Sequence, residues 1–103
     1  MDIQRTEDHG SSRTLTVYTT FEELLNKLGR PKDVSEETYK VDVEWNFFDA
    51  DTGRSLHIWN YKNGPNYLGE DGTPVAEIEK WSGDGSKELF EQLGIEAKEP
   101  HYR

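Results

Sequence analysis

Alternation of apolar and polar side chains from residue 39 to residue 47 constrains the fold of this chain more than any other feature. A strand places successive side chains on opposite faces, so this stretch predicts one buried and one solvated face. The buried face would hold Tyr39, Val41, Val43, Trp45 and Phe47, and the solvated face Lys40, Asp42, Glu44 and Asn46. Residues 49–53 are typical turn residues and residues 54–62 alternate again, so a long antiparallel hairpin is expected.

Two short amphipathic helices are predicted on either side of this hairpin. The first has apolar residues at helical spacing over residues 21–28, a capping box at Thr20 and Glu23, and Gly29 after its last turn. The second has an apolar stripe over residues 89–93, between a cap at Ser86 and a stop at Gly94.

The remaining segments complete a single α+β domain. Residues 13–19 predict a first strand, and residues 75–81 are compatible with either a third meander strand or a helical turn. Residues 1–12 and 96–103 are polar and aperiodic and are expected to be flexible tails, which leaves residues 13–95 as the domain. The predicted fold is an antiparallel three- to four-stranded sheet with two short helices packed on one face, in the order β-α-β-β-β-α.

Composition excludes several classes of protein. The 103 residues contain 12 basic and 21 acidic side chains, a net charge of −9, and no cysteine. The chain has no apolar run long enough for a membrane span or a signal peptide, and no thiol for a disulfide or a thiolate metal site. A cytoplasmic location is therefore expected, and the negative charge argues against direct binding to nucleic acid or to a membrane surface.

No pattern points to catalysis, a metal or a cofactor. Residues 49–53 resemble the start of a calcium loop, but Arg54 and Asn60 stand where that loop needs Gly and Glu. The three histidines lack metal-ligand spacing, and His57 is expected to be a solvated or stacked strand residue. Asp42 and Glu44 are more typical of a solvated acidic face than of a catalytic pair. We therefore expect a non-enzymatic protein.

The number of aromatic residues is the most informative feature of the composition. The chain has 12 of them, more than one face of a small sheet can bury. The second face, with Trp59 and Tyr61, could pack under Tyr67 and Leu68, meet a second copy of the chain, or bind a partner. A stacking pocket for nucleotides or sugars, built from Trp59, Tyr61 and Trp81, is a further alternative. The candidate partner-binding residues are Asp42, Glu44, Asp49, Asp51, Trp59, Tyr61, Glu70 and Asp71.

Three short segments with aromatic residues resemble segments of a known class of small proteins. Glu44-Trp45, the run from Leu56 to Lys62 after Thr52-Gly53, and Trp81-Ser82-Gly83 are similar to segments of small acidic accessory proteins of tailed bacteriophages. The likeness spans about residues 20–94. Such proteins are often inhibitors of host or defence machinery, anti-CRISPR proteins among them, so the resemblance implies a role as an inhibitor in the host bacterial cytoplasm.

The functional expectation combines this resemblance with the charge. We expect a protein that docks on a host or defence nucleic-acid-handling protein, with acidic and aromatic side chains meeting a basic groove built for phosphates. The alternative is a homodimeric structural or assembly accessory protein without an inhibitory role, in which the acidity serves solubility.

Overall fold

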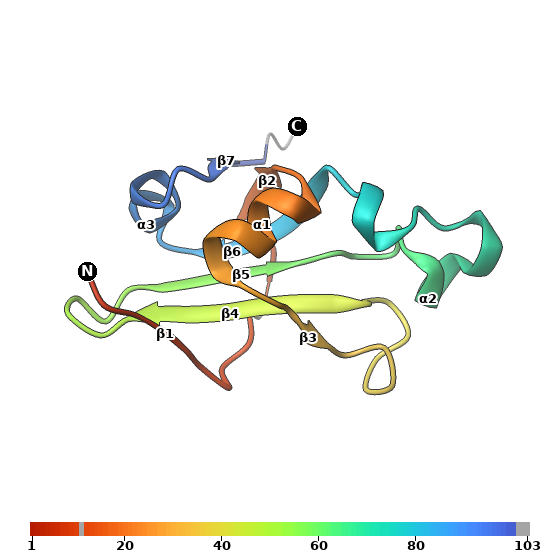
Figure 1. The fold of residues 1–103 in the computed structure, drawn as a ribbon, viewed down its shortest axis with the longest axis horizontal. Helices are drawn as coiled ribbons and strands as arrows, with labels where there is room; N and C mark the ends of the chain where they lie inside the picture. Colours follow the sequence, from red (N-terminus) through yellow and green to blue (C-terminus); the bar gives the residue numbers. More distant parts are fainter. Residues whose placement is uncertain (11, 101–103) are drawn as a thin grey trace.

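Antiparallel pairing joins seven strands of this chain into one sheet, in the computed structural model that describes residues 1–10 and 12–100 (Figure 1). The strand order is β1-β4-β5-β6-β2-β7, and β3 also pairs with β4. The strands are β1 (Ile3–Arg5), β2 (Leu15–Tyr18), β3 (Lys32–Asp33), β4 (Val43–Asp49), β5 (Ser55–Trp59), β6 (Lys80–Gly85) and β7 (Glu96–Lys98). The helices are α1 (Phe21–Leu28), α2 (Pro65–Leu68) and α3 (Lys87–Gln92), with 3₁₀ turns η1 (Gly69–Asp71) and η2 (Val75–Glu77). The α+β class is as predicted, whereas the sheet has more strands than expected.

The core lies between one face of the sheet and the helices α1 and α3, which Figure 1 shows on the same side of the sheet. Trp45 and Trp81 meet edge to face at its centre, with ring centroids 5.4 Å apart. Each indole N–H donates to a backbone carbonyl, Trp45 to Gly29 at 2.9 Å and Trp81 to Thr19 at 3.0 Å. The two largest core side chains therefore bury their apolar surface without leaving a donor unpaired.

Both predicted helices form where their caps indicated. The Thr20 hydroxyl accepts a hydrogen bond from the Glu23 backbone N–H at 3.1 Å, and Gly29 follows α1 with φ of 82°. The Ser86 hydroxyl accepts from the Leu89 N–H at 3.3 Å and begins α3. These side chains satisfy donors that a helix leaves free at its first turn.

The face of the sheet opposite the core is covered by residues 6–10 and 12–14, which we call the N-terminal cover. The Thr6 N–H donates to the Asn46 carbonyl, the Thr14 N–H donates to the Gly83 carbonyl, and Gly10 packs against Trp59 and His57. Residues 1–12 were expected to be a flexible tail, and cover by Tyr67 and Leu68 was one of three alternatives for this face, beside a second copy of the chain and a partner. Instead β1 pairs with β4 and leads the chain across the sheet, because backbone hydrogen bonds can hold a polar segment that has no apolar periodicity.

Two further expectations are corrected, and one question that the sequence left open is answered. Residues 96–98, expected in a C-terminal tail, pair with β2 as β7, whereas His101, Tyr102 and Arg103 lie outside the described residues, as does Ser11. The segment 75–81 divides between the two predicted states, with η2 first and β6 beginning at Lys80. The strand expected from Tyr39 begins only at Val43, and Tyr39 is 63% exposed instead of buried.

In the described part of the chain, no helix has both the length and the apolar character needed to cross a bilayer.

Candidate functional site

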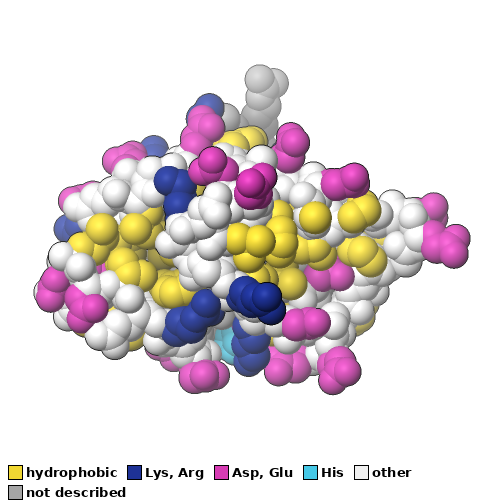
Figure 2. All heavy atoms as spheres, in the orientation of Figure 1, with side chains coloured by type: hydrophobic (Ala, Val, Ile, Leu, Met, Phe, Trp, Pro, Cys, Tyr) yellow, Lys and Arg dark blue, Asp and Glu magenta, His cyan; other side chains and the backbone are white. Residues whose placement is uncertain are grey.

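The eight candidate residues do not form one acidic face. Asp51 lies in the β4–β5 turn, whereas Glu70 and Asp71 belong to η1, and Figure 1 shows these segments at opposite ends of the molecule. Acidic side chains in Figure 2 lie around the rim of the displayed face and do not merge into a single patch. The expected docking surface is therefore divided, and each of its members has to be judged in its own surroundings.

Asp49 is buried and organises the β4–β5 turn. Its Oδ1 accepts from the backbone N–H groups of Asp2 and Asp51 at 2.9 and 3.1 Å, and its Oδ2 accepts from the Thr52 hydroxyl at 3.0 Å. The hydrogen bond from Asp2, and then those from Asp51 and Thr52, lower the pKa of Asp49 against the opposing effect of desolvation. Every polar contact of this carboxylate is thus made within the fold.

Glu44 is partly buried beneath the N-terminal cover. Its Oε1 lies 2.7 Å from His9 Nδ1, and the Glu44 side chain is only 14% exposed. The neighbouring His57 is buried as well, although a solvated or stacked residue was expected, and its Nδ1 lies 2.8 Å from Asn46 Oδ1. Desolvation lowers the pKa of His57, so the ring is neutral at pH 7.

Asp42 is the centre of a buried polar network. Its Oδ2 accepts from Asn60 Nδ2 at 2.7 Å, and its Oδ1 accepts from the Asn66 backbone N–H at 3.0 Å. Asn60 Oδ1 in turn accepts from the backbone N–H groups of Asp42 and Val43. The carboxylate was predicted on a solvated face, but Asn60 supplies the donor that allows it to be buried.

Asn66 extends this network into α2. Its side-chain Nδ2 lies within hydrogen-bond distance of three backbone carbonyls, those of Ser35, Thr38 and Val41, at 3.1, 2.6 and 3.1 Å. Gly64, which precedes α2, has no room for a Cβ because the Asp42 carboxylate lies directly against its backbone. The network therefore fixes α2 on the residues that precede β4.

Four exposed large side chains lie on the segments that this network joins, and we call them the tyrosine platform: Tyr39, Tyr61, Tyr67 and Leu68, which follows Tyr67 in α2. Their exposed fractions are 63%, 46%, 41% and 42%. The rings of Tyr39 and Tyr67 are in contact, with centroids 5.7 Å apart. Aromatic side chains of this kind, exposed yet held in place, are enriched in protein interfaces.

Two lysines lie over the rings of the platform. The Lys40 ammonium is 5.3 Å from the centroid of Tyr39, and the Lys62 ammonium is 5.3 and 5.8 Å from those of Tyr61 and Tyr67. Interaction with Tyr39, and then with Tyr61, raises the pKa of Lys40. The ring faces of the platform thus already accept cations.

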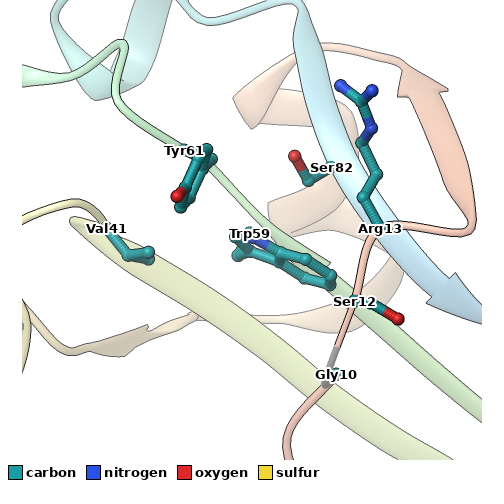
Figure 3. A pocket seen from close by; sticks show the side chains of 7 residues that line it. All are labelled: Gly10, Ser12, Arg13, Val41, Trp59, Tyr61 and Ser82. Carbon is teal, nitrogen blue, oxygen red and sulfur yellow. The ribbon is translucent and has the colours of Figure 1, made fainter.

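A groove adjoins the platform at Tyr61, and we call it the Trp59 groove. It is lined by Gly10, Ser12, Arg13, Val41, Trp59, Tyr61 and Ser82. Figure 3 shows the Trp59 indole between Val41 and Tyr61 on one side and Ser12 and Arg13 on the other. Trp81, which one alternative placed in a stacking pocket with Trp59 and Tyr61, lines a smaller cavity with Tyr61, but its ring is buried against Trp45 in the core.

Of the predicted site residues, the structure brings Tyr61 close to Trp59 in this groove, and it places Glu70 and Asp71 in the turn that directly follows α2. Sequence reasoning missed Tyr39 as a surface residue and missed Asn60 and Asn66 entirely. The available signal was the run Asn63-Gly64-Pro65-Asn66, whose asparagines can satisfy backbone groups in an irregular loop.

Within the described residues, no three side chains of the metal-ligating types gather closely enough to hold an ion. No protein-family model matches the chain, and a search of curated proteins finds no significant match.

Proposed function

We propose that this chain is a non-enzymatic binding protein that docks on a partner protein through the tyrosine platform. The observation that carries the proposal is the exposure of four large side chains on three segments, before β4, after β5 and in α2, that a buried polar network joins. Holding these side chains in one arrangement before binding reduces the entropy that docking would otherwise cost.

The charge around the platform is compatible with a partner that has basic side chains. Lys40 and Lys62 already lie over the three tyrosine rings and would repel a further cation there, so the attraction has to come from carboxylates. Glu70 and Asp71, exposed in the turn that directly follows α2, supply two of them. The net charge of −9 would speed the encounter with such a surface.

These properties are compatible with the class of partner expected from the sequence. A host or defence protein with a groove built for phosphates offers arginines and lysines around an accessible channel. Occupation of that channel by this chain would inhibit the partner, which is the role that the resemblance to phage accessory proteins implies.

The test begins with capture from a nuclease-treated bacterial lysate, elution in salt steps and identification by mass spectrometry. The purified partner is then titrated with the wild-type chain, with Tyr67→Ala and with the control Tyr18→Ala. Tyr18 matches Tyr67 in its 41% exposure and in a lysine over its ring, Lys98 at 5.6 Å, but it lies on β2, outside the platform.

The expected result is a loss of affinity of about tenfold or more for Tyr67→Ala and little change for Tyr18→Ala. Salt should release the partner, and Glu70→Gln with Asp71→Asn should weaken that salt dependence. Equal binding by Tyr67→Ala and Tyr18→Ala would exclude docking through the platform.

A further inference from the structure

The lining of the Trp59 groove combines aromatic surface with positive charge. The groove has a volume of about 640 Å³, within the range of small-molecule sites. A smaller cavity of about 200 Å³ shares Arg13, Tyr61 and Ser82 with it, and its other lining residues are Thr16, Asn63, Lys80 and Trp81. The two cavities are therefore neighbours that share Arg13, Tyr61 and Ser82.

The charge of this lining is opposite to that of the whole chain. Arg13 lines both cavities and Lys80 lines the smaller one, and the described residues that line them include no carboxylate, although acidic residues outnumber basic ones by 21 to 12 in the sequence. Among the described residues neither cation forms an ion pair, whereas Arg54 pairs with Glu88 at 3.0 Å. An anionic group placed here would meet two cations without having to displace a carboxylate.

The aromatic part of the lining is suited to a planar ring. Trp59 is partly exposed, and its indole is held from one side by contact with Gly10. Tyr61 and Val41 lie next to it, while the Arg13 side chain runs past Ser82 (Figure 3). Stacking on an indole or a phenol is worth about 1–3 kcal/mol per base in proteins that bind nucleobases.

We propose that the Trp59 groove binds a small planar ligand that carries one anionic group, of the class of the nucleoside monophosphates. The ring would stack beside Trp59 and Tyr61, and the anionic group would lie between Arg13 and Lys80. A single phosphate suits the site better than a polyanion, because the net charge of −9 repels additional negative charge. This site is distinct from the partner-docking role proposed for the platform and does not depend on it.

Tryptophan fluorescence tests the proposal directly. Trp45 and Trp81 are buried at 0% and 2% exposure, and although Trp81 lines the smaller cavity its ring packs against Trp45, so Trp59 is the indole that a ligand in the groove should perturb most. Adenosine monophosphate, adenosine and inorganic phosphate are titrated separately, and calorimetry provides a second measurement that is independent of the indole. The variants are Arg13→Gln in the groove and the control Arg54→Gln, whose side chain pairs with Glu88 outside it.

Saturable quenching by adenosine monophosphate is expected. Adenosine and inorganic phosphate should each bind with an affinity at least about tenfold lower. Arg13→Gln should weaken binding of the monophosphate by about tenfold, and Arg54→Gln should leave it unchanged. Tyr67→Ala should also leave it unchanged, which separates this site from the platform.

Three results would overturn the proposal. The first is the absence of saturable binding of the monophosphate by either method. The second is equal affinity for adenosine and its monophosphate, which would remove the anion site. The third is equal weakening by Arg13→Gln and Arg54→Gln, which would show that only overall charge matters.

Discussion

Asp49 illustrates how a carboxylate that looks like part of an acidic surface can serve the fold instead. Three donors, from Asp2, Asp51 and Thr52, converge on its two oxygens in the β4–β5 turn. Asp42 behaves similarly, because Asn60 and the Asn66 backbone satisfy it in a buried position. At the scale of single residues, therefore, donor side chains and backbone N–H groups nearby decide whether an acid faces solvent or the interior.

The hydrogen bonds to Asp49 predict a pH dependence of stability. The pKa of Asp49 is lowered in the folded chain, so its contribution to stability is complete above the ordinary aspartate pKa of about 4 and is lost as the pH falls below it. Asp49→Asn removes this titration. The difference in free energy of unfolding between wild type and Asp49→Asn should thus be constant from pH 7 to about pH 5 and shrink below about pH 4.

Urea unfolding at a series of pH values measures this difference. Asp71→Asn, at an exposed position in η1, is the control for the same substitution outside the β4–β5 turn. A difference for Asp49→Asn that stays constant down to about pH 3 would contradict the assignment.

At the scale of elements, apolar periodicity in the sequence predicted those helices and strands whose formation depends on burying apolar side chains. The helix α1 and the pairing of β4 with β5 follow from regularly spaced core residues such as Leu24, Trp45 and Ile58. β1 and β7 carry no such pattern, since they join the sheet by backbone hydrogen bonds between segments far apart in sequence. Pairing of this kind depends on tertiary context, which a single sequence does not display.

The same reasoning explains which parts of the candidate site were predictable. Tyr61 and Trp59 could be assigned to an aromatic face because strand alternation places them opposite Ile58. The tyrosine platform could not, because it depends on Asn60 and Asn66 satisfying buried backbone groups in an irregular loop. Side-chain capping of this type leaves only a short polar motif in the sequence.

The N-terminal cover depends on the close approach of the Gly10 backbone to the Trp59 side chain. A Cβ at this position would lie 2.6 Å from Cζ3 of Trp59, so Gly10→Val should displace the cover from β5 while the core on the other face persists. Trypsin should then cleave after Arg13 faster than in the wild type, since cleavage requires local opening. Glu7→Val, an exposed change in the same segment, is the control and should leave the rate unchanged.

Circular dichroism of the two variants shows whether the fold persists during this comparison. If Gly10→Val is folded and is cleaved after Arg13 no faster than Glu7→Val, close packing at Gly10 does not hold the cover in place.

At the scale of the whole molecule, the cover bears on the homodimer alternative. In that alternative the chain would self-associate through an open strand face, but residues of the same chain occupy part of that face. We therefore expect a monomer in solution.

Small-angle scattering and light scattering over a concentration series measure this. A molar mass of one chain at all concentrations is expected. A mass of two chains that does not change on dilution would instead support the homodimeric accessory protein.

The position of β2 in the sheet has a consequence for how the chain reaches this fold. Its two neighbours, β6 and β7, come from residues 80–98, so during synthesis β2 has no strand to pair with until most of the chain has been made. Until then its buried residues Leu15 and Val17 lack the partners that cover them. Because such distant contacts close late, folding should be slow for a chain of this size, and the nascent chain is most exposed to aggregation just before β6 arrives.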